Sequence, residues 1–241
     1  MFLTKAATVS HLRKEILIRE GLKKNAAAIP VDLGLGSINQ SFPDGCFPLT
    51  SVHEFCCSSI EDKTATTGFI AGLLSTLMKS TGVVLWITPT RNLFPPAFYA
   101  FGIDPARIIF IDLPREKDML WMMDEALKCN GLTAVVGEIH QLDFTASRRL
   151  QLAVEESKVT GFVIRQITNL NTTACVSRWR VTGLPSRSPG GLPGIGFPHW
   201  NVELLKIRNG KPGCWQLEWS DNRFKEITKE IPQHELQREA I

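Results

Sequence analysis

From residue 50 onward, short apolar runs alternate with stretches of helical periodicity, and this alternation limits the fold more than any other feature of the chain. The apolar runs are 52–56, 83–87, 107–113, 134–138 and 161–165, and the helical stretches are 65–79, 116–129 and 148–158. An apolar run without polar alternation is typical of a strand buried on both faces, and an intervening helix allows two such strands to pair in parallel. The sequence therefore predicts an α/β fold with a doubly wound, mainly parallel sheet and helices on both faces.

The pattern changes after residue 170. The stretches 175–182 and 200–207 alternate apolar and polar residues, which is typical of strands with one exposed face. Residues 209–213 read Asn-Gly-Lys-Pro-Gly and predict a hairpin turn, whereas the glycines and prolines of 183–198 indicate a loop. We therefore expect antiparallel strands at the C-terminal edge of the sheet.

Charge divides the chain into three parts. They are a basic N-terminal helix (1–29), a core (30–220) and a charged, flexible tail (221–241). Arg13, Lys14 and Arg19 belong to a basic stretch whose apolar residues keep helical spacing. This amphipathic helix is a candidate contact for DNA or for a partner protein, and a solvated helix at the edge of the domain is the alternative.

The composition is that of an ordinary globular protein, because 44% of the 241 residues are hydrophobic, 21% are charged and the net charge is +3. No apolar run reaches the roughly 20 residues that cross a bilayer, so we expect no membrane contact. The N-terminus turns polar and basic without the apolar segment of a signal peptide, which predicts a cytoplasmic location. The six cysteines include no C-x-x-C pair, so we expect no metal ion.

Lys63 and Thr64 stand where a phosphate-binding loop would have its lysine and its serine or threonine. Such a loop reads G-x-x-x-x-G-K-[ST], lies between a strand and a helix, and binds phosphate with backbone N–H groups that its glycines expose. Here Cys57 and Asp62 replace the two glycines. Their side chains hinder the close approach of phosphate, and the Asp62 carboxylate repels it. The sequence thus predicts a degenerate loop over 57–62.

The same segment also fits the start of a helix. In that interpretation the side-chain oxygens of Ser58, Ser59 and Asp62 accept hydrogen bonds from backbone N–H groups. Lys63 is then a surface charge. The two interpretations differ in whether Lys63 faces a nucleotide site or solvent.

The stretch 30–165 resembles the RecA ATPase core in the order and spacing of its elements. The resemblance implies that Lys63 and Thr64 match the phosphate-loop lysine and the magnesium-ligating threonine. It also implies that Glu138 stands at the position of a strand-end aspartate, and that Gln166 matches the glutamine that senses nucleotide.

Thr90 stands where RecA has the glutamate that activates the attacking water. A threonine cannot act as a general base near neutral pH. We therefore expect no catalytic residue and no cofactor, with ATP and magnesium as the alternative.

More closely, the chain resembles the ImuA family of RecA-like accessory proteins from the bacterial mutagenesis cassette. The segments that carry this resemblance are FPLTSVHEF, LFPPAFYAFGIDPARIIFIDLPREKDMLWMMDEALKC, AVVGEIHQLDFTASRRLQLAVEESKVTGFVIR, NLNTTACVSRWRV and PGIGFPHWNVELLKIRNGKPGCWQLEW. The resemblance implies a non-enzymatic adaptor in error-prone translesion DNA synthesis, induced by DNA damage as part of the SOS response. The implied partners are an ImuB-like Y-family polymerase protein and an error-prone replicative-type DNA polymerase, with RecA and single-stranded DNA as further candidates.

Two other functions stay open at this point. One is a weak ATPase or ATP-gated switch that uses Lys63 and Thr64. The other is an inhibitor of cell division similar to SulA, which also looks like a RecA core without its phosphate loop.

Further residues are candidates for contacts with other molecules. Arg148 and Arg149 can bind phosphate or an acidic partner, and solvated helix charges are the alternative. Trp86 and Trp121 lie in runs predicted to form the core, and the last four tryptophans lie in alternating strands where packing is expected. The segments 141–145 and 168–173, which match the DNA-binding loops of RecA, are short and nearly uncharged, so we do not expect filament-type DNA binding.

Overall fold

The fold was analysed in a computed structural model, which describes residues 31–79, 82–166, 171–186 and 196–227. The chain divides into two units, 1–31 and 32–241, and nearly all of the first unit lies outside the described residues. The predicted basic helix of 1–29, with its candidate contacts Arg13, Lys14 and Arg19, is therefore outside the described residues as well.

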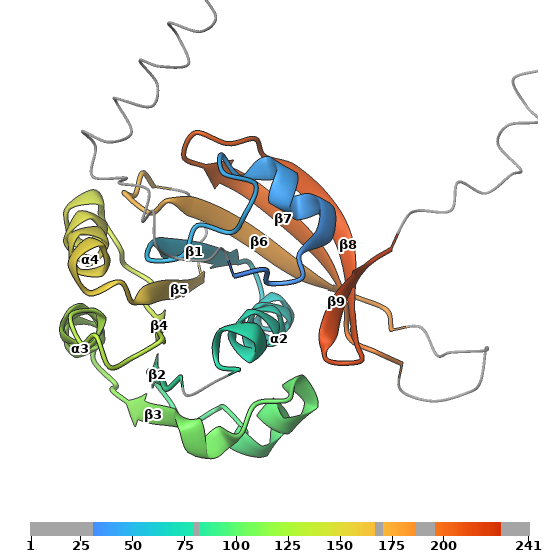
Figure 1. The fold of residues 1–241 in the computed structure, drawn as a ribbon. Coiled ribbons are helices and arrows are strands. Elements are labelled where there is room, and N and C mark those ends of the chain that lie inside the picture. The colour runs from blue at the N-terminus through green and yellow to red at the C-terminus, as the bar shows by residue number, and fades with distance from the viewer. Residues whose placement is uncertain (1–30, 80–81, 167–170, 187–195, 228–241) are drawn as a thin grey trace, which may run out of the picture. The chain divides into compact units, whose positions relative to one another are not determined.

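In the described part of the chain, nine strands form one sheet in the order β3-β2-β4-β5-β1-β6-β7-β8-β9 (Figure 1). The strands are β1 (Val52–Cys57), β2 (Val84–Thr88), β3 (Ile108–Asp112), β4 (Ala134–Glu138), β5 (Thr160–Gln166), β6 (Ser177–Leu184), β7 (His199–Ile207), β8 (Gly213–Ser220) and β9 (Arg223–Glu226). Pairing is parallel from β3 to β6 and antiparallel from β6 to β9. The first five strands are those predicted from the apolar runs.

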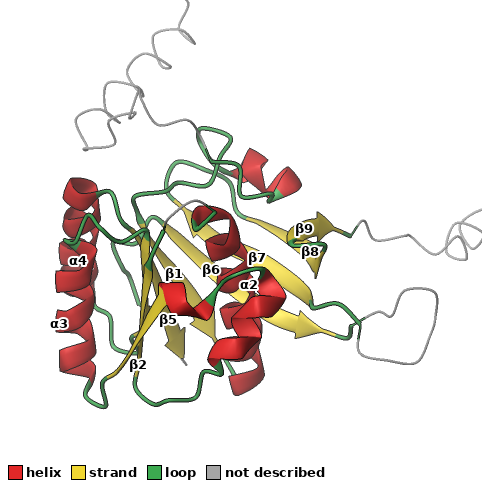
Figure 2. Ribbon diagram, turned by 60° about the horizontal axis from the view of Figure 1, so that its bottom comes forward, coloured by secondary structure: helices red, strands yellow, loops and turns green. Residues whose placement is uncertain are grey.

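Helices cover both faces of the parallel strands (Figures 1 and 2). The α-helices are α2 (Ile60–Leu77), α3 (Glu116–Leu127) and α4 (Phe144–Ser157), and the short 3-10 helices are η1 (Gly36–Ser41), η2 (Pro95–Phe101) and η3 (Pro105–Arg107). Helix α2 packs on one face and α3 with α4 on the other. This arrangement is the predicted RecA-like, doubly wound α/β fold.

Two apolar clusters hold these layers together, one on each face of the sheet. On the α2 face, Phe55, Phe69 and Trp179 lie at the centre of a set of packed rings. On the other face, Met123 and Val154 belong to the cluster that α3 and α4 form with the strands. Burial on both faces explains why β4 reads as an apolar run up to its terminal glutamate, whereas the equally buried β1 also contains His53 and Glu54.

The antiparallel strands expected after residue 170 are confirmed by the pairing of β6 to β9. In addition, β6 pairs with β1 in parallel and so continues the main sheet before β7 reverses direction. One expectation was wrong. The segment 221–241 was expected to be a flexible tail, but Arg223–Glu226 forms the edge strand β9. Phe224 explains this, because its ring is 7% exposed and packs against Trp219 with a centroid distance of 4.9 Å.

The tryptophans are mostly packed, with one correction. Trp86, Trp179, Trp200 and Trp219 are buried, as expected from their strands, and Trp215 is half-buried. Trp121 was assigned to the core from its apolar neighbours, but it is 59% exposed on the outer side of α3. In the described parts of the chain, the helices are too short or too polar to span a membrane.

Candidate functional site

The turn after β1 is much tighter than a phosphate-binding loop. Only Ser58 and Ser59 separate the end of β1 from the start of α2. Ser59 is the N-cap of the helix, and its side chain accepts a hydrogen bond from the N–H of Asp62 at 3.2 Å. In return, the Asp62 carboxylate accepts one from the N–H of Ser58 at 3.2 Å. This reciprocal cap confirms the interpretation of the segment as a helix start and replaces the loop predicted over 57–62.

The cap and the first helical turn engage three backbone N–H groups that a phosphate-binding loop would leave free. A phosphate-binding loop works because several free N–H groups converge on phosphate oxygens. Here the N–H groups of Ser58 and Asp62 are bonded within the cap, and the N–H of Lys63 donates to the Ser59 carbonyl at 3.2 Å. The two acidic residues in the first turn, Glu61 and Asp62, place negative charge where phosphate would have to enter.

Lys63 forms an ion pair with Glu138 at the carboxyl end of β4. The Nζ atom of Lys63 lies 2.6 Å from Oε2 of Glu138, and the two side chains are 25% and 2% exposed. Among the described residues, the ion pair with Lys63 is the one contact that satisfies this buried Oε2. The expectation that Lys63 is a solvated surface charge is therefore wrong, because an almost fully buried carboxylate requires its positive charge.

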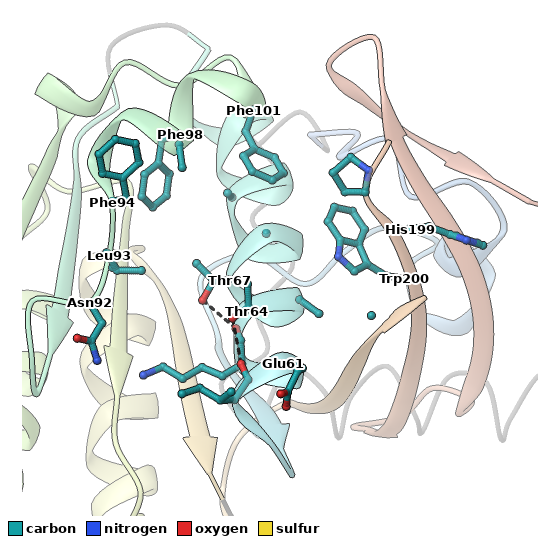
Figure 3. A pocket seen from close by; sticks show the side chains of 18 of the residues that line it. Glu61, Thr64, Thr67, Asn92, Leu93, Phe94, Phe98, Phe101, His199 and Trp200 are labelled. Atoms are coloured by element: carbon teal, nitrogen blue, oxygen red, sulfur yellow. Dashed lines mark hydrogen bonds between the residues drawn. The ribbon is translucent and has the colours of Figure 1, made fainter. Parts of the chain in front are cut away.

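The threonines of α2 direct their hydroxyl protons to the helix backbone. Thr64 donates to the Ile60 carbonyl at 3.0 Å, and Thr67 donates to the Lys63 carbonyl at 2.9 Å (Figure 3). Such bonds to the preceding turn are common for threonine inside helices. The hydroxyl proton of Thr64 is thus engaged by the backbone of its own helix.

A large cleft opens beside this ion pair, where the carboxyl ends of the parallel strands meet α2 and η2. We call it the strand-end cleft, and its volume is about 1110 Å³. Its polar end contains Glu61, Lys63, Thr64, Asn92 and Glu138, and its apolar walls contain Leu93, Phe94, Ala97, Phe98, Phe101, Leu184 and Trp200. Figure 3 shows the phenylalanines gathered at one end of the cleft and Glu61 with Thr64 at the other.

The structure thus brings together only some of the residues that the RecA resemblance assigned to a nucleotide site. Lys63, Thr64 and Glu138 line the cleft. Gln166 lies outside its lining, at the end of β5, where its N–H donates to Nδ1 of His140 at 3.2 Å. Thr90 lies outside it as well, and its carbonyl accepts a hydrogen bond from Thr88.

The arginines of α4 have different surroundings. Arg148 is exposed. The guanidinium of Arg149 is bonded to Asp124 on α3 at 3.0 Å, and the Asp124 side chain is 8% exposed. Arg149 therefore ties two neighbouring helices together, and Arg148 is the more available of the two for a partner.

Sequence reasoning missed a buried ionic cluster around Glu54 in the middle of β1. Glu54 is fully buried, and its carboxylate is bonded to Arg165 on β5, to Nε of Arg178 on β6 at 2.9 Å, and to the hydroxyl of Thr173 at 2.8 Å. A glutamate in a strand that is predicted to be buried is the signal in the sequence, and it does not indicate the partners.

The cluster extends to the two segments that leave β4 and β5. Arg165 donates to the His140 carbonyl at 3.0 and 3.2 Å and to Oδ1 of Asn171 at 3.0 Å. Asn171 in turn donates to the Leu142 carbonyl at 2.9 Å. These bonds fix the backbone that follows β4 and β5. Both segments lie at the carboxyl ends of the parallel strands, as the strand-end cleft does.

The buried cysteines do not offer a nucleophile. Burial, followed by the negative charge of Glu54, raises the pKa of the Cys56 and Cys175 thiols to about 12. Burial also raises the pKa of Cys57, which stands at the first glycine position of the phosphate-loop pattern. These thiols stay protonated near neutral pH, and a protonated thiol is a poor nucleophile.

We expect that replacing Lys63 by methionine lowers the free energy of unfolding by about 2 kcal/mol, because Glu138 would lose the cation that pairs with it. This loss of stability is smaller than for a fully buried ion pair, since the Lys63 side chain is partly exposed to water. Urea denaturation at neutral pH measures it. Arg91→Met is the matched control, because Arg91 is 90% exposed in its ion pair with Asp112 and its loss should have much less effect. Equal losses of stability in the two variants would show that the Lys63–Glu138 pair contributes no more to the free energy of unfolding than an exposed ion pair does.

Comparison with known proteins adds an independent observation. No family model matches the chain. The chain is 34% identical over 201 residues to the Protein ImuA of Caulobacter vibrioides, in both strain NA1000 and strain ATCC 19089, and the match covers 78% of this chain and 82% of the relative. This similarity extends well beyond the strand and helix that form the site. The chain belongs to the ImuA family.

Proposed function

We propose that this chain is a non-enzymatic, RecA-like adaptor in error-prone translesion DNA synthesis, within the DNA-damage (SOS) response of bacteria. Membership of the ImuA family supports a role in the bacterial mutagenesis cassette. The observation that carries the non-enzymatic part is the capped two-residue turn between β1 and α2. An adaptor of this kind keeps the RecA-like sheet as a scaffold, and its partners perform the polymerase chemistry.

Three features of the site favour an adaptor over a nucleotide hydrolase. The N–H groups of Ser58 and Asp62 are bonded within the helix cap, and that of Lys63 is bonded to the Ser59 carbonyl. The ammonium of Lys63 is paired with Glu138. Thr90 supplies no general base, and phosphoryl transfer depends almost entirely on such positioned groups. We therefore propose that neither ATP nor magnesium is a cofactor.

The proposed partners are an ImuB-like Y-family polymerase protein and an error-prone replicative-type polymerase. RecA and single-stranded DNA are further candidates. A pull-down with purified partners tests this assignment, and it should retain the Y-family-like protein on this chain. Retention of the cell-division GTPase in place of the polymerase proteins would instead support a SulA-like inhibitor.

We expect no saturable binding of a fluorescent ATP analogue with magnesium at concentrations up to about 1 mM, the range in which even weak specific sites fill. The physical reason is that the N–H groups of Ser58 and Asp62 are bonded within the helix cap and that Glu61 and Asp62 repel phosphate. Fluorescence anisotropy measures the binding. Arg148→Ala is the control for unspecific attraction of phosphate to exposed cations. Saturable micromolar binding that Lys63→Ala abolishes and Arg148→Ala leaves intact would favour an ATP-gated switch and contradict the proposal.

A further inference from the structure

We propose that the strand-end cleft binds a peptide segment of a partner protein, and that this segment has apolar anchor side chains and one basic residue. The proposal rests on the adaptor function. It names the class of ligand for a cleft whose lining includes the residues that the RecA resemblance assigns to nucleotide binding. Its first support is the chemistry of the walls. Phe94, Phe98 and Phe101 line one side of the cleft and Trp200 lines another, so most of the surface offers apolar contacts (Figure 3).

The size of the apolar surface favours a peptide over a small molecule. The cleft volume of about 1110 Å³ lies above the roughly 300–1,000 Å³ of ordinary small-ligand pockets. At its rim, Ile60 is 71% exposed and Phe94 is 70% exposed. A small ligand inside the cleft would leave these rim side chains in water, whereas a peptide that enters from the rim covers them.

The charged side chains in the lining of the cleft determine which kind of peptide it can bind. Among the described residues, the charged groups in the lining of the cleft are the carboxylates of Glu61 and Glu138 and the ammonium of Lys63. Because Lys63 pairs with Glu138 at 2.6 Å, Glu61 is the one of these three charges that the other two do not compensate. A basic side chain of the peptide would pair with Glu61, while phosphate or an acidic peptide would be repelled. An arginine gains additionally from the neighbouring aromatic rings.

The hydrogen-bonding pattern of the α2 wall agrees with recognition by shape and apolar contact. The hydroxyl protons of Thr64 and Thr67 are directed to backbone carbonyls of the same helix. They are therefore not free to donate to a ligand. Specificity in this wall thus comes from the aromatic anchors and from Glu61.

Panning a phage-displayed library of peptides of about 12 residues against the intact chain tests the proposal, because peptides of this length can place several anchors in one groove. We expect the enriched peptides to combine apolar anchors with a basic residue. Their affinity should fall at least tenfold for Phe94→Ser and for Glu61→Lys, because both substitutions change the cleft directly. Isothermal titration with synthetic copies of the enriched peptides measures the change.

Two matched controls lie on the opposite face of the sheet. Trp121→Ser removes an equally exposed aromatic ring from α3, and Glu156→Lys reverses an exposed charge on α4. Both should leave peptide affinity unchanged. Circular dichroism of all four variants verifies that each is folded before its affinity is compared.

Several outcomes would overturn the proposal. They are a failure to enrich any peptide, an acidic consensus, or equal affinity for the wild type and the cleft variants. Self-association of the chain that Phe94→Ser abolishes would identify a second copy as the occupant instead. The adaptor function is judged separately in the same preparations: if the Y-family-like protein still binds Phe94→Ser and Glu61→Lys as well as the wild type, the adaptor stands and only the cleft assignment fails.

Discussion

Replacing Glu54 by alanine is expected to lower the free energy of unfolding by about 3–5 kcal/mol, because two arginines would be left buried without their counter-ion. Arg165 and Arg178 are 3% and 12% exposed, and both are bonded to the Glu54 carboxylate. Neither guanidinium can lose its charge, since arginine stays protonated in proteins. Urea denaturation at neutral pH, followed by tryptophan fluorescence, measures the loss.

Two further variants make this result specific. Glu203→Ala removes the carboxylate that pairs with Arg180 at 3.4 Å, where both side chains are about a third exposed, and should cost only about 0–1 kcal/mol. Glu54→Gln removes the charge but keeps an oxygen for Thr173, so its loss should lie between those of Glu54→Ala and Glu203→Ala. A loss below about 1 kcal/mol for Glu54→Ala would mean that water or backbone groups replace the carboxylate.

The Glu54 cluster also bears on the candidate site. It bonds the backbone after β4 at His140 and the segment after β5 at Asn171. Both segments leave the same edge of the sheet as the strand-end cleft. A variant that loosens the cluster is therefore expected to affect partner binding through the position of these segments, without touching the partner itself.

The strands of the parallel sheet could be predicted because burial on both faces leaves a direct mark on the sequence. Strands β1 to β5 lie within one or two residues of the predicted apolar runs. The start of α2 was harder to predict. Ser59 and Asp62 form a capping pair, but the same stretch also fits the frame of a phosphate-binding loop. Only the hydrogen bonds of the folded turn decide between the two.

The ionic contacts could not be predicted because their partners are distant in the sequence. Glu54 meets Arg165 and Arg178 across 111 and 124 positions, and the register of β1 with β5 and β6 creates both contacts. The pairing of Lys63 with Glu138 likewise depends on α2 lying over the end of β4. The periodicity of a sequence predicts its helices and strands. It does not predict which strands become neighbours in the sheet, and these ionic contacts depend on that order.

Trp121 and Phe224 show the same limit for apolar residues. Helix α3 has five consecutive large apolar residues at 119–123, so its periodicity does not identify one buried face, and the structure buries Met119 and Met123 but not Trp121. Phe224 is flanked by charged residues, which obscures a strand of only four residues. Its ring nevertheless completes the cluster on α2.

The second large effect is expected from His53, which should make the free energy of unfolding depend on pH. Its ring is fully buried, with Nε2 2.9 Å from the Pro48 carbonyl and Nδ1 2.6 Å from the Ser177 hydroxyl. The carbonyl can only accept, so Nε2 carries the proton and Nδ1 accepts from the hydroxyl in the neutral ring. Burial lowers the pKa of His53 from 6.5 to about 3, although the hydrogen bond to Pro48 acts in the opposite direction.

Between these two pKa values the unfolded chain binds a proton at His53 and the folded chain does not, so the free energy of unfolding must fall as pH falls. The contribution is complete above about pH 6.5 and is lost at about 1.4 kcal/mol per pH unit, or about 2 kcal/mol by pH 5. His53→Gln removes the titrating group and keeps a donor for Pro48 and an acceptor for Ser177. Urea denaturation of both proteins from pH 7.5 to 5 should therefore show a stability difference that shrinks by about 2 kcal/mol as the solution is acidified. A difference that stays constant over this range would mean that His53 takes up its proton equally in the folded and the unfolded chain, so that burial does not lower its pKa.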